Sequence, residues 1–239
     1  MENAKSGGFI YRYDDLTPDP LAPAKGTPHT DEIGVHITHY VGNITSVYHE
    51  LVSTYVHVDV YWVKPTPERP FHTLVTSGMS DLPMHTPESA KDRAHIELCL
   101  SLPSSWPVDQ ALNHTDEDQN QGDGQPYWPI WWLKFLARFP HQYQTWLGQG
   151  HTIPDGNQPF IDYTRFCSFV LLPPVLFDDG FQQLKLPHYS IYFYNLVPIY
   201  PEELQLKLDQ GVNVLIDRFN EYRISDVWAV DRVNVGLVD

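Results

Sequence analysis

Histidine and aspartate residues at two spacings are the first candidates for chemistry in this 239-residue chain. His36 and His39 are three residues apart in a segment with helical spacing. His57 and Asp59 lie at positions i and i+2 of a strand-like run, where alternate side chains share a face. The sequence has no HExxH motif, no paired CxxC motif and no third ligand at a recognisable distance, so we expect no metal site and no cofactor. A metal-assisted hydrolase that uses His57, Asp59 and a distant histidine is the alternative.

A short polar turn is the second candidate. The segment Ser77-Gly-Met-Ser-Asp81 directly follows a strand-like run, and a strand end that opens into a glycine turn is a position where a nucleophile can stand. Serine and aspartate also form local turns by hydrogen bonding to backbone amides, which requires no chemistry. Because the chain has no GxSxG motif, we interpret the segment as a turn and predict no catalytic residue, so the protein is not expected to be an enzyme.

Glycines and tryptophans gather around the segment 148–156, GQGHTIPDG. This segment has neither the Walker lysine nor the strand-then-helix context of a dinucleotide site, so we interpret it as a tight loop supported by Gly148, Gly150 and Gly156. Aromatic density next to such a loop marks either a core seam or a binding surface, and the core is the commoner answer. The tryptophans concerned are Trp128, Trp131, Trp132 and Trp146.

The charge balance is strongly acidic. The chain has 15 Lys and Arg residues against 30 Asp and Glu residues, which gives a formal net charge of -15. This field repels phosphate backbones and anionic membranes, so we expect neither nucleic acid nor membrane as a partner. The same field would speed the encounter with a basic protein, and improved solubility alone is the other explanation.

Cysteine usage and the first residues of the chain indicate the compartment. Cys99 and Cys167 each lie in an apolar run, where a thiol usually acts as a small core hydrophobe, and two cysteines make no disulfide framework. The N-terminal residues lack a basic patch followed by an apolar stretch, and no apolar run approaches the roughly 20 residues that span a bilayer. We therefore expect a cytoplasmic protein.

The first half of the chain predicts one helix followed by strands. Residues 1–29 carry four prolines and no sustained period, so we expect an arm, with regular structure starting after it. Thr30 is a plausible N-cap of a helix that ends at Gly42. Period-two and β-prone runs then predict successive antiparallel strands, the last of them with one buried face. These runs cover residues 46–51, 55–63, 71–76 and 95–102.

The second half predicts a long loop, a helix, two strands and two more helices. The polar segment 107–126 has the character of a surface loop, either a tolerated insertion or a contact surface. A helix follows, with Pro129 in its first turn and Pro140 forcing a break before a continuation to about Leu147. Two strands and two helices complete the series, without a repeat or linker: 161–172, 189–199, 201–211 and 212–222. One α+β domain is the economical interpretation, and a split near 107–126 is the alternative.

Five ordered blocks of sequence resemble the suppressor of fused family. The strand and turn of residues 73–84, TLVTSGMSDLPM, are similar to a strand of that family followed by a Gly-x-Ser-Asp turn. Four further blocks resemble successive segments of bacterial members: RAHIELCLSLPSSWP, WPIWWLKFLARFPHQYQTWLGQGHTIP, FCSFVLLPP and YFYNLVPIYPEELQLKL. The resemblance spans roughly residues 30–235.

The resemblance implies a single α+β domain over residues 30–239, with a mixed, mostly antiparallel sheet and helices packed against it. Animal relatives add a second lobe and hold a transcription-factor peptide between the lobes, and we expect this chain to lack that lobe. Bacterial relatives are commonly proposed to be immunity proteins that neutralise a toxin. The resemblance therefore implies a non-enzymatic binding protein with a protein partner, such as a basic toxin domain. A peptide-binding regulatory adaptor is a further alternative, and the oligomeric state stays open.

Two loops carried by regular elements are the predicted partner-binding surface. The first is the turn with Gly78, Met79, Ser80 and Asp81, and the second is the loop with Gly150 and His151.

Overall fold

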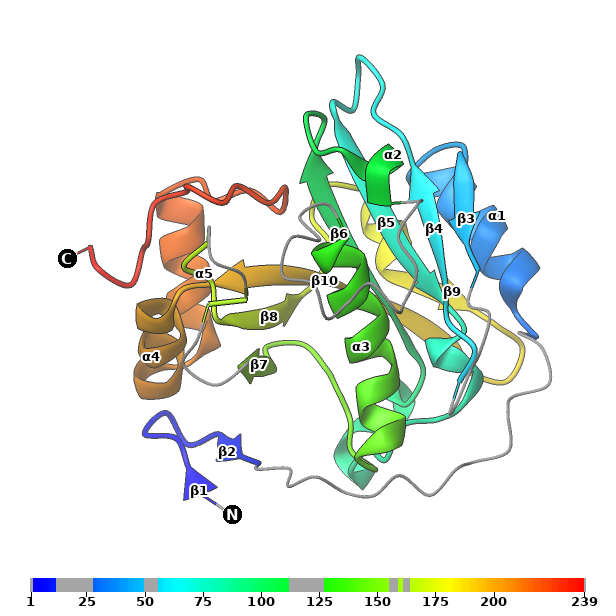
Figure 1. Ribbon diagram of the computed structural model, residues 1–239. Helices are drawn as coiled ribbons and strands as arrows, with labels where there is room; N and C mark the ends of the chain where they lie inside the picture. The colour runs from blue at the N-terminus through cyan, green and yellow to red at the C-terminus, as the bar shows by residue number, and fades with distance from the viewer. Residues whose placement is uncertain are drawn as a thin grey trace.

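A mixed, mostly antiparallel β-sheet forms the centre of the molecule (Figure 1). The computed structural model describes residues 2–11, 28–49, 56–111, 127–154, 159–160 and 164–238. The sheet has eight described strands in the order β3-β4-β5-β6-β10-β8-β7, and β9 pairs with one end of β10. Helices pack against both faces of the sheet, which agrees with the predicted α+β class.

The first half of the sheet is an antiparallel meander, as the successive strand-like runs predicted. It consists of β3 (Ser46–Tyr48), β4 (Asp59–Val63), β5 (Phe71–Ser77) and β6 (Ile96–Pro103). The prediction that β6 has one buried face was wrong. Its residues Ile96–Leu102 are all buried, including Glu97 and Ser101, because helices pack on both sides of the sheet.

The second half of the sheet is organised by β10 (Ser190–Ile199). Its first part runs parallel to β6 and also pairs with β9 (Gln183–Lys185), whereas its second part is antiparallel to β8 (Ser168–Leu172). β7 (Thr152–Pro154) completes that edge. The predicted run 161–172 gives a strand only from Ser168, and residues 161–163 lie outside the described part of the chain.

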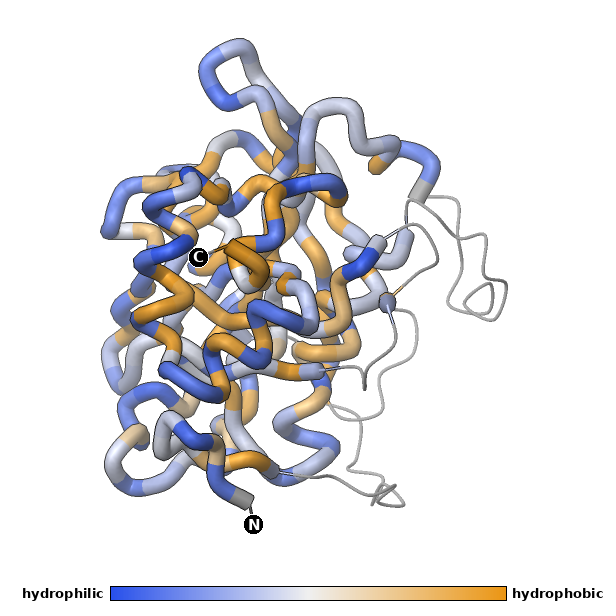
Figure 2. The backbone as a smooth tube through the Cα atoms, turned by 90° about the vertical axis from the view of Figure 1, so that its left-hand side faces the viewer, coloured by the Kyte–Doolittle hydropathy of each residue, from blue (hydrophilic) through white to orange (hydrophobic). Residues whose placement is uncertain are grey.

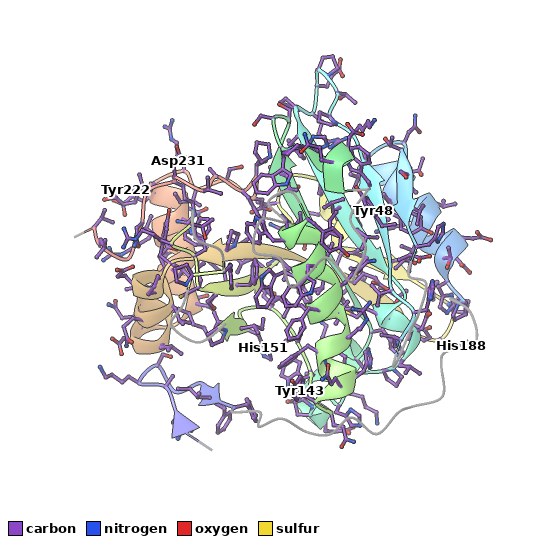
Figure 3. The ribbon with its side chains drawn as sticks, in the orientation of Figure 1. Tyr48, Tyr143, His151, His188, Tyr222 and Asp231 are labelled. Carbon is purple, nitrogen blue, oxygen red and sulfur yellow. The ribbon has the colours of Figure 1, made fainter. Side chains whose placement is uncertain are left out.

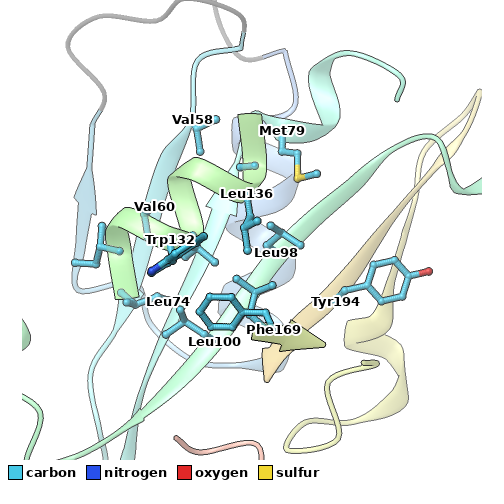
Figure 4. Close-up of a cluster of buried hydrophobic side chains, with 14 of the residues drawn as sticks. Val58, Val60, Leu74, Met79, Leu98, Leu100, Trp132, Leu136, Phe169 and Tyr194 are labelled. Carbon is cyan, nitrogen blue, oxygen red and sulfur yellow. The ribbon is translucent and has the colours of Figure 1, made fainter. Parts of the chain in front are cut away.

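Two helices sandwich the meander. α1 (Thr30–Tyr40) places Ile33 and Ile37 against one face, and α3 (Trp128–Gln142) covers the other face with a larger apolar cluster. Figure 4 shows Trp132 and Leu136 of α3 above strand residues that include Leu74, Leu98 and Leu100. Burial of these aliphatic and aromatic side chains supplies most of the stabilisation of the sheet.

A third apolar cluster lies at the β8 end, where α4 (Pro201–Gln210) and α5 (Val212–Glu221) pack on β8 and β10. Pro201 begins α4 and Gly211 separates the two helices, as the sequence predicted. Figure 2 looks onto this side and shows hydrophobic segments inside and hydrophilic segments mainly around the outside. Short helical segments complete the fold: η1 (Met79–Asp81), η2 (Glu88–Arg93), α2 (Val108–Ala111) and η4 (Asp179–Gln182).

Three predicted details need correction. Thr30 is the first helical residue and His29 takes the N-cap position, without a side-chain cap. Pro140 does not break α3, because it lies in the last turn, where the missing N–H removes one helical hydrogen bond just before the helix ends at Gln142. The expected helical continuation to Leu147 is therefore absent, and the chain there is a loop.

The N-terminal residues contain regular structure that the sequence did not indicate. β1 (Glu2–Asn3) and β2 (Phe9–Ile10) form a small antiparallel hairpin. The hairpin is tied to the end of α4, since the Ser6 amide donates to the Leu208 carbonyl at 3.0 Å and Lys5 pairs with Asp209 at 3.1 Å.

Residues 112–126 of the expected long loop lie outside the described residues. In the described part of the chain, every helix is too short or too polar to cross a bilayer.

The segment after α5 closes a gap where β6 and β10 diverge. Val227 forms a bridge with Ser101 of β6, and the Trp228 amide donates to the Ser101 carbonyl at 2.9 Å. The Trp228 indole N–H donates to the Leu196 carbonyl of β10 at 2.8 Å. One tryptophan therefore joins the two halves of the sheet.

A buried ion pair fixes the same segment. Arg232 donates to both Glu203 carboxylate oxygens at 2.6 Å, and the two side chains are 8% and 0% exposed. The carboxylate also accepts from the Tyr200 and Val235 amides at 3.0 Å. Glu203 thus caps the start of α4 and holds the end of the chain with one side chain.

Replacing Arg232 with methionine tests this arrangement. The Arg232→Met variant leaves a buried carboxylate without its cation, so the free energy of unfolding should fall by about 3 to 5 kcal/mol in urea titrations. Arg165→Met is the matched control, because Arg165 is 66% exposed and lies 3.5 Å from Glu202. That change should cost less than about 1 kcal/mol. Equal losses in the two variants would contradict the assigned role.

Candidate functional site

The predicted turn after β5 bends through a glycine. Gly78 has a φ of 115°, a conformation that side chains with a Cβ rarely adopt. The chain then forms the single 3-10 turn η1, in which the Asp81 amide donates to the Gly78 carbonyl at 3.2 Å. The interpretation of this segment as a turn is confirmed.

A buried carboxylate from the neighbouring strand holds the turn. Glu97 of β6 is 0% exposed. Its Oε1 accepts from the Gly78 amide at 2.9 Å, the Ser80 amide at 3.0 Å and the Ser80 hydroxyl at 2.6 Å, and its Oε2 accepts from the Thr76 hydroxyl at 2.6 Å. Burial raises the pKa of Glu97, and the hydrogen bonds from Ser80, Thr76 and Gly78 oppose that shift. The turn is therefore built around a side chain 17 to 21 residues away in sequence.

The carboxylate of Asp81 differs from that of Glu97 in its hydrogen bonding. Both of its carboxylate oxygens are buried and lack a hydrogen-bond partner among the described residues. Burial, followed by the nearby Glu97 carboxyl, raises the pKa of Asp81 to about 7. A buried carboxylate without donors is uncommon in folded proteins and calls for an explanation.

Two histidines support the turn as neutral donors. A ring nitrogen of His95 donates to the Ser80 carbonyl at 2.7 Å, and a ring nitrogen of His141 in α3 donates to the Met79 carbonyl at 3.0 Å. Burial lowers the pKa of both rings, that of His141 to about 4. The His95 ring also stacks on Tyr189 with centroids 3.9 Å apart. The turn is thus tied to β6, α3 and the hairpin between β9 and β10.

The structure divides the four predicted turn residues into two kinds. Met79 and Ser80 are completely buried and Gly78 is buried as well, so these three residues form the buried part of the turn. Asp81 is the residue of this group with an exposed part. Any contact between the turn and a partner therefore involves Asp81 first.

The second predicted loop extends the pairing of β8. The Gly150 amide donates to the Leu171 carbonyl at 2.7 Å, and the His151 carbonyl accepts from the Leu171 amide at 2.9 Å. Gly150 has a φ of 79°, which explains the glycine, whereas Gly156 lies outside the described residues. The half-buried His151 ring lies against Trp146 with centroids 4.3 Å apart, and burial lowers its pKa to about 4.

The chain that follows α3 connects the two loops. The His85 amide donates to the Thr145 carbonyl at 3.0 Å, and the Leu147 amide lies 3.4 Å from the Met84 sulfur. The segment that follows η1 is therefore bound to the segment that precedes Gly150. In Figure 3, His151 lies beside β7 and Tyr143 lies at the end of α3, the helix that carries His141. No described hydrogen bond joins the turn residues directly to Gly150 or His151.

Members of the two predicted pairs form hydrogen bonds within the protein. His36 is buried, with a ring nitrogen that donates to the Phe181 carbonyl at 3.0 Å. Asp59 accepts from His57 at 2.9 Å and from His49 at 3.0 Å, so its carboxylate orients both rings. Among residues whose side chains are described, no group of three or more His, Cys, Asp or Glu residues is arranged to hold a metal ion.

Sequence reasoning missed Glu97, His95 and His49 as members of these clusters. Glu97 interrupts an apolar strand, and a charged residue in such a strand was a signal that its carboxyl group has a specific partner. His49 follows Tyr48, which pairs with Val60, so the strand register places it opposite Asp59.

The expectation that the tryptophans belong to the core is confirmed for Trp128 and Trp132, which are 7% and 6% exposed.

A change of pH should reveal the Asp81 environment. The ordinary pKa of the group is 3.8 and its folded value is about 7, so folding takes up a proton. The resulting stabilisation is complete below pH 3.8 and is lost as the pH rises to 7. The Asp81→Asn variant does not undergo this loss. The melting temperature of the variant minus that of the wild type should therefore be several degrees larger at pH 8 than at pH 5.

Asp92→Asn is the matched control, because it makes the same chemical change at an aspartate that is 67% exposed in η2. Its melting temperature relative to the wild type should stay the same at both pH values. An Asp81→Asn variant that behaves like this control would contradict the described environment of Asp81.

Comparisons with known proteins agree on one family. The family model of suppressor of fused protein (SUFU) matches residues 54–233, which is more than half of the chain. No curated protein matches the chain in sequence.

Three solved structures are similar in fold. A putative SUFU homolog from Neisseria gonorrhoeae has a TM-score of 0.62 at 17% identity, over 88% of this chain and 98% of that chain. The Sufu-Fu complex gives 0.60 at 16% identity, over 88% and 93%. Drosophila Suppressor of Fused gives 0.57 at 16% identity, over 86% of this chain but 50% of that one. These likenesses show the fold, and the match to the family model shows that the chain belongs to the suppressor of fused family.

Proposed function

We propose that this protein is a non-enzymatic binding protein that acts as a bacterial immunity protein and neutralises a cognate toxin. The observation that carries the proposal is membership of the suppressor of fused family, together with the likeness to a structure of a Sufu-Fu complex. In that structure a protein of this fold is bound to another protein. The transfer of protein binding to this chain is part of the proposal.

The charge of the chain supports a basic partner. A net charge of -15 attracts a cationic surface and accelerates the diffusional encounter. Toxin domains that act on nucleic acid carry such surfaces, because they must bind phosphates. An acidic immunity protein can therefore compete with the substrate of such a toxin for the same surface.

The turn around Asp81 and the loop with Gly150 and His151 are the proposed contact surface. The Gly78 and Ser80 amides of the turn donate to the Glu97 carboxylate of β6, and Gly150 and His151 of the loop form backbone hydrogen bonds with Leu171 of β8. Loops held by a rigid scaffold bind with a small loss of conformational entropy. The arrangement is therefore suited to recognition of a folded partner.

We place this encounter in the bacterial cytoplasm. Cys99 and Cys167 are free and buried in the core, which fits a reducing compartment. A toxin that enters or is made in the cell would meet its inhibitor there.

The test is to mix the purified protein with the toxin encoded beside its gene. We expect a stable complex in size-exclusion chromatography, loss of toxin activity and rescue of growth on co-expression. The association rate should fall by at least tenfold between 0.05 and 0.5 M NaCl, because salt screens electrostatic steering. No complex and no rescue would refute the immunity function, and a rate independent of salt would refute the electrostatic part.

A further inference from the structure

We infer that the carboxylate of Asp81 is the acceptor for an arginine side chain of the protein partner. This inference rests on the proposed function and names the chemistry of the group that the turn receives.

The first observation is that two neighbouring carboxyl groups differ in the hydrogen bonds that they accept. Glu97 accepts three hydrogen bonds from the turn and one from Thr76 of β5, whereas both Asp81 oxygens are without a donor among the described residues. The Gly78 and Ser80 amides and the Ser80 hydroxyl are directed at Glu97 and not at Asp81. An unsatisfied buried carboxylate destabilises the free protein, and a donor from outside would remove that cost.

The second observation is that Asp81 forms no ion pair with a cation in the described part of the chain. None of the ion pairs among the described residues includes this side chain. The charged and titratable groups that face it are Glu97 of β6 and the Tyr189 phenol of the β9–β10 hairpin. Beyond them lie His95 and His141, with His29 and His85 as their neighbours. The rings of His95 and His141 are neutral at pH 7, so they do not compensate a negative charge on Asp81.

The geometry favours arginine over lysine. Two unpartnered oxygens of one carboxylate match the parallel N–H groups of a guanidinium, which binds them as a bidentate pair. The stacked pair of His95 and Tyr189 lies next to the turn, and guanidinium groups pack well against aromatic rings. Asp81 is partly exposed as a residue, although both of its carboxylate oxygens are buried.

Arrival of a cation also changes the protonation of the site. Asp81 has a pKa of about 7 in the free protein, and a bound guanidinium lowers it. Binding therefore releases a proton over the range in which free Asp81 is protonated. The affinity should rise as the pH increases from 6 to 8, and the rise should disappear when Asp81 cannot ionise.

Two probes test the inference. The first is the toxin encoded beside the gene, with dissociation constants measured at pH 6 and pH 8 for the wild type, Asp81→Asn and the charge-matched control Asp92→Asn. We expect Asp81→Asn to weaken binding at least tenfold at pH 8 and to remove the pH dependence. We expect Asp92→Asn to change the constant by less than threefold and to keep that dependence. Circular dichroism confirms that each variant is folded.

The second probe is the tripeptide acetyl-Gly-Arg-Gly-amide, with the citrulline tripeptide as its neutral isostere. The Asp81 carboxyl carbon is followed by NMR at pH 6.5. We expect the arginine peptide at millimolar concentration to shift this signal toward the ionised value, and we expect the citrulline peptide to leave it unchanged.

The outcomes separate the inference from the proposed function. A toxin complex of equal affinity in the wild type and Asp81→Asn would refute the inference and leave the immunity function standing. Failure of the toxin to bind, together with a specific response to the arginine peptide, would refute the immunity function and support the acceptor role. An NMR signal of the Asp81 carboxyl carbon that does not shift when the arginine peptide is added would overturn the acceptor role.

Discussion

The turn after β5 depends on one buried carboxylate, that of Glu97. Without it, the Gly78 and Ser80 amides and the Ser80 hydroxyl would be buried without an acceptor, a cost of about 1 to 3 kcal/mol for each group. The carboxylate therefore explains why the chain can reverse direction inside the protein and present Asp81 at a defined position. His95 and His141 complete the arrangement by donating to the Ser80 and Met79 carbonyls, which need a donor that a carboxylate cannot provide.

Three acidic residues illustrate three ways of placing a carboxyl group inside this fold. Glu203 is neutralised by Arg232 and holds the end of the chain against α4. Glu97 is stabilised by hydrogen bonds alone and shapes a turn. Asp81 has neither compensation among the described residues. The first two carboxylates serve the structure of the free protein, whereas the third makes sense when a partner supplies the missing donor. Unfavourable groups of this kind are typical of binding sites, where function is retained at a cost in stability.

The sequence predicted the elements of this fold better than the contacts between them. Alternating and β-branched runs located the meander, and Pro201 and Gly211 marked the boundaries of α4, because these signals depend on local conformation. Glycine at position 78 predicted the turn for the same reason. The acceptor of that turn could not be predicted, since it comes from another strand. Glu97 looked like a residue on a solvent-exposed face, whereas the structure buries it completely, and Pro140 looked like a break until the end of α3 was known.

Amide hydrogen exchange at Gly78 and Ser80 tests the central claim most directly. If Glu97 builds the turn, both amides should exchange slowly in the wild type and at least a hundredfold faster in Glu97→Leu, while the amides of β5 and β6 away from the turn stay protected. Fast exchange at Gly78 and Ser80 in the wild type, or unchanged protection in the variant, would contradict the account.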